Sequence, residues 1–330
     1  MLAKSHFLRE SSKMSADPFS EIIELTQAQA VHAGGFTAGG DWAIRFQARH
    51  RIKMSAVLKG SCWFWFEDEA DAAIQLEAGD VGLLACQRNY VMASAPGVKP
   101  VEATSLFSAV GRTTAILGDG SRFSFIGGHI LLDPANGWLL ADVLPPWLHI
   151  KGGATEAATF GWLLNRLVEE SAAGQLGARL VSSHLAQLLF TEILRVHLKL
   201  GGPLPAGWLR ALADPRTAPA VRLMHGSPGD NWTLSDLAKA CAMSRTAFVG
   251  HFKATVGKTP LSYLTDWRMH LAEKALRTNT VAVSTIGQSL GYASESAFSN
   301  AFKRVTGRSP MAVRRQGAMA TAVRLLATDN

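Results

Sequence analysis

Hydrophobic and polar positions change their spacing along this 330-residue chain. From residue 17 to residue 150, short apolar runs rich in aromatic and β-branched residues alternate with Gly, Pro and Asp, which is typical of β-strands. The apolar run at residues 61–66 is expected inside a sheet, and Ala78-Gly79-Asp80 predicts a tight turn into the next strand. The spacing of these runs favours a small all-β sandwich or barrel.

Between residues 155 and 200 the apolar spacing lengthens to that of two amphipathic helices. The residues expected to share a face are Phe160, Leu163, Leu164 and Leu167 in the first helix, and Leu185, Leu188, Leu189, Ile193 and Val196 in the second. Gly and Pro residues at 201–205 end the second helix, and Asp214-Pro215 marks a further break. The stripe of the second helix packs either on the β domain or on a second copy of the chain.

The C-terminal region contains an internal repeat with an offset of 50 residues. The repeated positions are Ser244, Ala247, Phe248, Phe252, Lys253, Gly257 and Pro260, followed by Ser294, Ala297, Phe298, Phe302, Lys303, Gly307 and Pro310. Each copy predicts a short helix, a tight turn and a second helix. In the first copy Thr233 and Asp236 can form a capping box before a turn at residues 242–244, and Gly291 provides the turn of the second copy.

The second helix of each copy begins at a serine that can cap it, and its exposed N-terminal end suits a DNA major groove. We expect Ala247, Phe248 and Phe252 to face the core. The residues predicted to face DNA are Arg245, Thr246, Val249, Gly250 and Lys253 in the first copy, and Glu295, Ser296, Ser299, Asn300, Lys303, Arg304 and Arg308 in the second. Ser299 and Asn300 suit base edges, whereas Lys303, Arg304 and Arg308 suit phosphates.

Positive charge is concentrated in the same region. Residues 1–214 contain 18 basic and 20 acidic residues, a net charge of −2, whereas residues 215–316 contain 14 and 5, a net charge of +9. This asymmetry favours a polyanionic partner. Between the two copies, residues 261–277 predict a helix about 25 Å long, which could hold two reading helices about 34 Å, or one DNA turn, apart. Two ordinary helical hairpins with solvating charges are the alternative.

The spacing of these residues resembles a known family. The matching patterns are Phe248-x-x-x-Phe252-Lys253 through Gly257-x-x-Pro260, and Ile286-Gly287-x-x-x-Gly291-Tyr292-x-x-x-x-x-Phe298-x-x-x-Phe302-Lys303-x-x-x-Gly307-x-x-Pro310. Over residues 232–315 the chain resembles the AraC/XylS family of transcription regulators. The resemblance implies two reading helices in successive major grooves of double-stranded promoter DNA, with RNA polymerase as a further partner. Gly250 and His251 stand where relatives often carry Arg, so the first reading helix is expected to contribute less.

Residues 17–150 resemble the cupin-type sensor domain found in some of these regulators. The residues that carry the resemblance are Leu58-x-Gly60-x-x-Trp63, Leu76-x-x-Gly79-Asp80-Val81-x-Leu83-Leu84 and Leu144-Pro145-Pro146-x-x-His149-Ile150. Such a fold can bind a small-molecule effector inside the sandwich, and we expect Trp63 and Trp65 to bind it. The alternative is that both tryptophans only fill the core.

No metal, cofactor or catalytic residue is predicted. Metal-binding cupins place two His one residue apart, but Arg49-His50-Arg51 holds a lone His between two cations, and His129 and His149 are isolated. Ser, His and Asp residues form no nucleophile motif. The three cysteines have no C-x-x-C spacing, and no signal peptide or membrane span is apparent, so a cytoplasmic protein is expected.

We therefore expect a multidomain bacterial transcription regulator. Its predicted parts are a leader (1–16), an all-β cupin-like sensor domain (17–152), a helical connector that can form a homodimer (153–214), an all-α double helix-turn-helix domain (215–316) and a tail (317–330). Two other interpretations stay open, which are a cupin-fold metalloenzyme with an accessory DNA-binding tail and a constitutive architectural DNA-binding dimer. Substrate turnover would favour the first, and DNA binding without any effector would favour the second.

Overall fold

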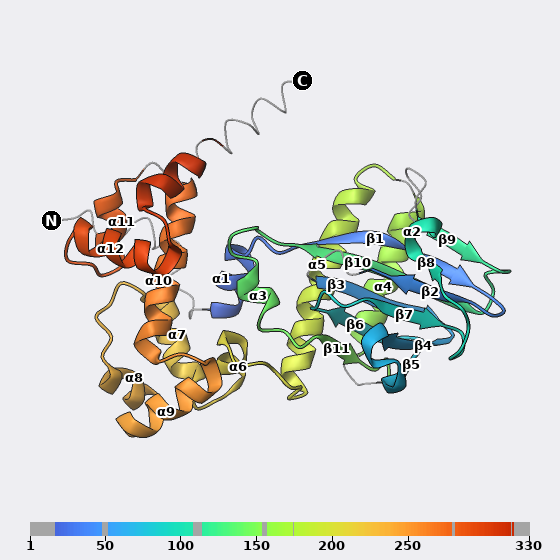
Figure 1. The fold of residues 1–330 in the computed structure, drawn as a ribbon, viewed down its shortest axis with the longest axis horizontal. Helices are drawn as coiled ribbons and strands as arrows, with labels where there is room; N and C mark the ends of the chain where they lie inside the picture. Colours follow the sequence, from blue (N-terminus) through green and yellow to red (C-terminus); the bar gives the residue numbers. More distant parts are fainter. Residues whose placement is uncertain are drawn as a thin grey trace. The chain divides into compact units, whose positions relative to one another are not determined.

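The computed structural model describes residues 17–47, 52–107, 114–153, 157–173, 175–278, 281–317 and 319. They form two compact units, each described by itself below (Figure 1). One unit is Thr26–Pro205, and the other is residue 206 onward together with helix α1 (Pro18–Leu25). The units therefore divide at residues 205 and 206, whereas the sequence suggested breaks after residues 152 and 214. The leader and most of the tail lie outside the described residues.

Two sheets form the framework of Thr26–Pro205. Their strand orders are β11-β6-β3-β10-β1-β9 and β5-β4-β7-β2-β8. The strands are β1 (Gln29–Ala38), β2 (Ala43–Phe46), β3 (Ile52–Lys59), β4 (Ser61–Phe66), β5 (Ile74–Glu77), β6 (Val81–Leu84), β7 (Tyr90–Ala93), β8 (Val101–Glu102), β9 (Thr114–Leu117), β10 (Phe123–Leu131) and β11 (Trp147–Ile150). Short helices η1 (Glu67–Ala72), α2 (Ala103–Leu106) and α3 (Trp138–Ala141) connect some of them. The predicted all-β architecture is confirmed.

Aromatic side chains fill the space between the two sheets. Phe36, Trp42 and Phe123 are buried in one continuous cluster with residues of both sheets. Phe64 of β4 stacks on Trp147 of β11, with 4.7 Å between the ring centroids. Because side chains alternate along a strand, every second residue of β4 enters this core. The interior of the sandwich is therefore packed with side chains.

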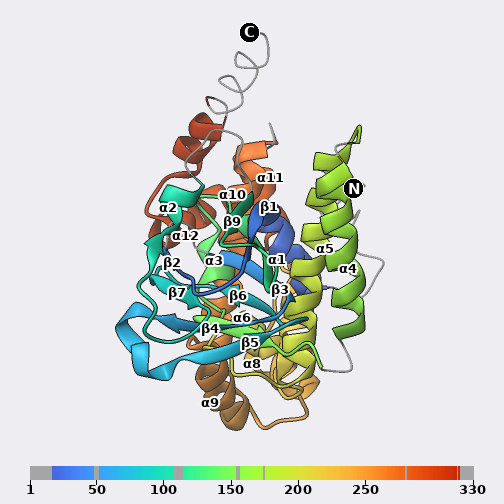
Figure 2. The same ribbon diagram turned by 90° about the vertical axis from the view of Figure 1, so that its right-hand side faces the viewer.

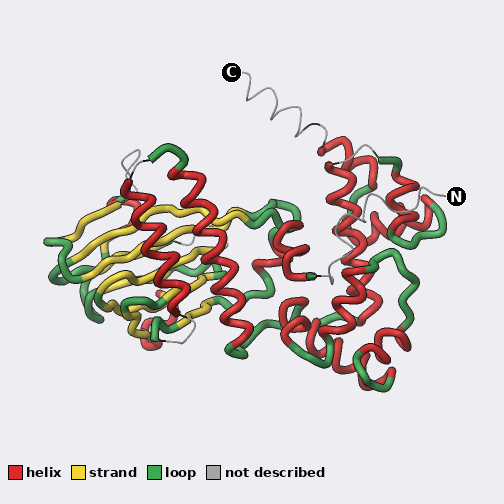
Figure 3. Tube along the Cα trace, turned by 180° about the vertical axis from the view of Figure 1, so that it is seen from behind, coloured by secondary structure: helices red, strands yellow, loops and turns green. Residues whose placement is uncertain are grey.

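Two helices, α4 (Ala157–Ala173) and α5 (Ala178–Lys199), lie side by side across the outer face of the first sheet (Figures 2 and 3). The face predicted for α4 is buried, including Phe160 and Leu167. Helix α5 packs against β1, and the backbone N–H of Ala30 in β1 donates to Gln187 Oε1 in α5 over 2.9 Å. The stripe predicted for α5 is partly wrong, because Leu188 is 44% exposed while Phe190 is fully buried. Helix α5 packs on α4 as well as on β1, which turns its buried face away from Leu188.

The second unit is helical. After α1 it contains α6 (Trp208–Ala213), α7 (Ala218–Gly226), α8 (Leu234–Ala240), α9 (Arg245–Val256), α10 (Pro260–Thr278), α11 (Val283–Ser289) and α12 (Glu295–Thr306). Its apolar residues form two clusters, one around Phe248 and Phe252 and one around Phe298 and Phe302. Helix α10 supplies residues to both clusters and so connects the two repeats.

Helix α1 packs against α7 and α10. Buried His225 of α7 donates from Nδ1 to Glu21 Oε2 over 3.0 Å, and its Nε2 accepts a hydrogen bond from the Tyr263 hydroxyl over 2.7 Å. Burial lowers the pKa of His225, and the neutral imidazole satisfies both partners. The same ring stacks on Trp267 at 4.0 Å. Helix α1, assigned from the sequence to the β domain, therefore completes the core of the helical unit.

Candidate nucleic-acid interface

Local signals set the ends of α9 and α12. Ser244 Oγ and Ser294 Oγ each accept a hydrogen bond from the backbone N–H three residues on, over 3.3 and 3.2 Å. The helices end at Gly257 and Gly307, whose φ angles are 83° and 73°. This left-handed conformation favours glycine and stops a helix. The repeated start and stop signals therefore give two helices of 12 residues each.

The turns that precede these helices differ by one residue. Thr233 and Asp236 form the predicted capping box of α8. The chain then turns at Ala242, with a φ of 52°, and in the second repeat at Gly291, with a φ of 84°. Ala242 and Gly291 are 49 positions apart, whereas the capping serines are 50 apart. The second turn therefore holds one extra residue, and the two repeats are similar but not identical in geometry.

Paired phenylalanines anchor both helices. Phe248 and Phe252 of α9, and Phe298 and Phe302 of α12, are all 0% exposed. Their spacing of four residues places each pair on one side of its helix. The prediction that Ala247 faces the core is wrong, because Ala247 is exposed. It lies about 100° around the helix from Phe248, beyond the edge of the buried face.

The residues predicted to face DNA lie mainly on the exposed sides of α9 and α12. The exposed ones are Arg245, Thr246, Gly250 and Lys253 on α9, and Glu295, Ser296, Asn300, Lys303 and Arg304 on α12. Val249 and Ser299, which are equivalent in the two repeats, are half-buried. Within each helix the residues recur at intervals of about one turn, so the fold brings each set onto one face.

Arg308, which was also assigned to phosphate contact, is engaged within the protein. Its guanidinium donates to Glu273 Oε1 over 2.5 Å and to Gln316 Oε1 over 2.9 Å. Glu273 is 5% exposed and also accepts a hydrogen bond from Arg277 over 2.8 Å. A buried carboxylate needs such cationic partners. The sequence did not reveal this role, because Glu273 and Arg308 are distant along the chain.

His251, on the first reading helix, is also held by the protein. Its Nε2 lies 2.5 Å from Asp214 Oδ2, at the end of α6. Gly250 beside it is exposed, and an added Cβ there would meet nothing within 4 Å. Neither residue carries a guanidinium group. The smaller contribution to base reading that is expected of α9 stays a prediction.

The two tryptophans predicted to line an interior pocket face away from it. Cys62, Phe64 and Phe66 of β4 enter the sandwich core, so the alternate residues Trp63 and Trp65 lie on the outer face of the second sheet. Trp65 packs there against a small apolar cluster. The prediction of an interior pocket lined by Trp63 and Trp65 is wrong. In the run at residues 61–66 almost every residue is apolar, so no alternation of polar and apolar residues indicates which side chains point inward.

The described residues offer no metal centre. His149 Nε2 lies 2.8 Å from Asp80 Oδ2, and Asp80 also accepts hydrogen bonds from the backbone N–H groups of Glu77 and Gly152. These contacts give His149 a structural role. His50 lies outside the described residues. Among the residues that are described, no three His, Cys, Asp or Glu side chains are grouped to hold a metal ion, and no helix has the length and apolar character to cross a membrane.

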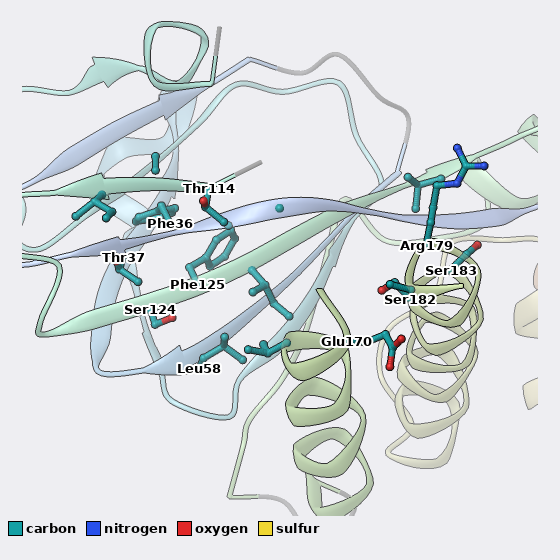
Figure 4. Close-up of a pocket in the computed structure, with 18 of the residues that line it drawn as sticks. Phe36, Thr37, Leu58, Thr114, Ser124, Phe125, Glu170, Arg179, Ser182 and Ser183 are labelled. Atoms are coloured by element: carbon teal, nitrogen blue, oxygen red, sulfur yellow. The ribbon is translucent and has the colours of Figure 1, made fainter. Parts of the chain in front are cut away.

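A groove of about 910 Å³ lies between the outer face of the first sheet and helices α4 and α5 (Figure 4). Phe125 and other sheet residues line one end, and Glu170, Ser182 and Arg179 line the end at the helices. Apolar Ile116 at this groove is 75% exposed. The buried Glu170 carboxylate pairs with Arg166 over 2.8 Å. The sequence does not reveal this groove, because its lining comes from several separate elements.

Comparison with known proteins gives the class and the family of this chain. Residues 17–199 match a family model described as cupin, and residues 237–316 match one described as helix-turn-helix domain. Putative AraC-like transcription regulators of Streptomyces lividans and Streptomyces antibioticus are 37% and 35% identical over 89% of this chain and 96% and 97% of theirs. The HTH-type transcriptional regulator AlkR of Acinetobacter baylyi is 30% identical over 84% of this chain and 92% of its own.

These matches define a DNA-binding transcription regulator. The chain belongs to the AraC-type regulators and combines an N-terminal cupin domain with a C-terminal helix-turn-helix domain. The family and the domain types inferred from the sequence are confirmed.

The different surroundings of Arg304 and Arg308 lead to a testable contrast. Arg308→Ala removes one of the two cationic partners of buried Glu273, so we expect it to lower the free energy of unfolding by about 1–2 kcal/mol. Exposed Arg304→Ala removes the same charge and should change stability by less than about 0.5 kcal/mol. Urea denaturation followed by circular dichroism measures both. Equal stability of the two variants would contradict the structural role of Arg308.

Proposed function

We propose that this regulator binds promoter DNA by inserting the N-terminal ends of α9 and α12 into successive major grooves. The observation that carries the proposal is the repeat of one exposed polar face on two capped helices, in a segment with a net charge of +9. Buried phenylalanine pairs hold each helix, so its exposed face is preorganised for a rigid partner. Helix N-termini with free N–H groups also favour nearby phosphates.

Within α12, we assign base reading to Asn300 and Ser299 and phosphate contact to Lys303 and Arg304. An amide can donate and accept hydrogen bonds at once, as the major-groove edge of adenine requires. A flexible ammonium group provides charge but little sequence information. Asn300 and Lys303 are both exposed on the same helix, one turn apart, which makes them suitable for a paired test.

Replacing these two residues separates base reading from phosphate contact. We expect Asn300→Ala to weaken binding to the cognate site by about 1–3 kcal/mol and to leave binding to random DNA almost unchanged. Lys303→Ala should weaken both equally and reduce the salt dependence of binding by about one phosphate contact. Titrations at several salt concentrations, on DNA selected from a random library by the full chain, measure both effects. An equal loss for Asn300→Ala on both DNAs would refute its role.

We further propose that a small-molecule effector binds in the groove beneath α4 and α5. Two observations support this site over the barrel interior. Aromatic side chains occupy the interior, whereas the groove, at about 910 Å³, has the size of a ligand pocket. Its lining is mainly apolar, with Glu170, Arg179 and Ser182 at the end near the helices and the hydroxyl groups of Thr114 and Ser124 at the sheet end. These features suit a largely apolar molecule that carries hydrogen-bonding groups.

Filling the groove tests the effector site. Thr114, exposed at the groove, is replaced by Trp, with Val101→Trp on the second sheet as the matched control. The fluorescent probe 8-anilinonaphthalene-1-sulfonate should bind one saturable site in the wild type and in the control, and bind Thr114→Trp about tenfold more weakly. A metabolite that shifts the melting temperature of the wild type alone should also change its DNA affinity. Unchanged probe binding by Thr114→Trp would contradict the site.

We propose homodimerisation through the outer surfaces of α4 and α5. Trp162 and Leu188 are 63% and 44% exposed there, and apolar side chains of this size are costly to leave in water. Sedimentation velocity should show a dimer for the wild type and a monomer for Trp162→Glu. A wild type that sediments as a monomer at about 10 µM, a typical assay concentration, would contradict the proposal.

We infer that the chain is a regulator without enzymatic activity, that it works with RNA polymerase, and that it acts in the cytoplasm, where bacterial promoter DNA lies. The inference is supported by the named relatives, which are regulators. Substrate turnover or stoichiometric metal in the purified protein would instead favour a cupin enzyme. An effector that changes DNA affinity would exclude a constitutive architectural role.

A further inference from the structure

The two helix-turn-helix units meet at a second place besides α10. The loop between α7 and α8 approaches the turn between α11 and α12 backbone to backbone. A Cβ added to Gly229 of the loop would lie 2.3 Å from the carbonyl oxygen of Ser289. A Cβ added to Gly291 of the turn would lie 2.5 Å from the carbonyl oxygen of Gly229. No residue larger than glycine fits at Gly229 without moving the two units apart.

Arg268 of α10 holds this contact from the side. Its Nε donates to the carbonyl oxygen of Pro228 over 2.6 Å, and its Nη2 donates to that of Asp230 over 2.8 Å. Its guanidinium carbon lies 5.9 Å from the centroid of the Tyr292 ring, in the turn of the second unit. One half-buried side chain therefore contacts the first unit through two hydrogen bonds and the second through an aromatic ring.

Both partners of the contact are internally braced. In the loop, the indole N–H of Trp232 donates to the carbonyl oxygen of Ser227 over 2.9 Å, and the Asp230 N–H donates to the same oxygen over 3.2 Å. In the turn, the Tyr292 N–H donates to the carbonyl oxygen of Gly287 over 3.0 Å. Because hydrogen bonds hold both the α7–α8 loop and the α11–α12 turn in shape, their contact resists rotation of one helix-turn-helix unit about α10 relative to the other.

We propose that this interlock, formed by Pro228, Gly229, Asp230, Arg268 and Gly291, fixes the distance and angle between α9 and α12 before DNA binds. The regulator would then accept one spacing between the two DNA segments that its reading helices contact. The inference rests on the proposed insertion of both helices into DNA. Arg268 and Gly229 act here as positioning residues, since neither is assigned to contact a base.

The geometry of DNA makes spacing a sharp probe of such rigidity. One inserted base pair moves a half-site by about 3.4 Å along the duplex and about 34° around it. A protein with locked reading helices must deform the DNA or lose contacts at one helix. A protein whose units are joined only by α10 can adjust, at the cost of weaker binding to the preferred spacing.

The experiment compares spacing penalties among variants of the full chain. The cognate DNA, selected from a random library, is remade with one base pair inserted or deleted between the two contacted segments, and Kd is measured for each. We expect the wild type to lose about tenfold in affinity for each altered spacing. Arg268→Ala and Gly229→Ala should each reduce that penalty to about threefold or less and weaken binding to the original spacing. Arg268→Lys should be intermediate, because it keeps the charge without the forked donor.

Arg222→Ala on α7 is the matched control. Arg222 is exposed, carries the same charge as Arg268 in the same helical unit, and is not one of the residues of the interlock. The control should keep the full wild-type penalty. If Gly229→Ala does not fold, as judged by circular dichroism, Arg268→Ala still decides, because it adds no atoms. A folded Arg268→Ala with the wild-type penalty overturns the interlock. A wild type that is indifferent to spacing also overturns the interlock, because flexibly joined units adjust in the same way. Protection of only one guanine cluster from dimethyl sulfate, measured on the same DNA, would instead overturn the insertion of both helices.

Discussion

The complete burial of two phenylalanines on each reading helix is the interaction on which the DNA-binding unit depends. A helix of 12 residues is marginal in water on its own, so its stability comes from packing. Phe248 and Phe252 supply that packing in one repeat and Phe298 and Phe302 in the other, and truncating one such side chain typically costs about 3–5 kcal/mol. Because packing uses one side of α9 and of α12, the opposite side of each helix can carry polar residues for a nucleic-acid partner.

Helix α10 joins the two helix-turn-helix units into one packed domain. It contributes to both hydrophobic clusters, and Arg268 on it reaches the backbone of one unit and an aromatic ring of the other. Helix α1 closes the core near His225, so residues from the beginning of the chain stabilise its DNA-binding end. The cupin unit is also stabilised by ring packing, since aromatic side chains fill its interior and its groove lies outside the first sheet.

The sequence predicted features that depend on neighbouring residues. The cap at Ser294 and the turn at Gly291 have strong local signals, and the 50-residue repeat reinforced them. Features set by distant partners were not predictable. Trp65 and Leu188 lie in apolar runs, and the elements that pack on these runs determine which residues face inward. Arg308 pairs with the carboxylate of Glu273, which lies 35 residues away along the chain. Side-chain types alone could not distinguish a phosphate ligand from an internal ion pair.

Both reading helices are proposed to enter the major groove of the same duplex. Methylation protection tests this proposal most directly, because dimethyl sulfate attacks guanine N7 in that groove. On DNA selected by the full chain, the account predicts two clusters of protected guanines on one face of the duplex, about 10 base pairs apart. A single protected cluster, with no second cluster one turn away, would contradict it.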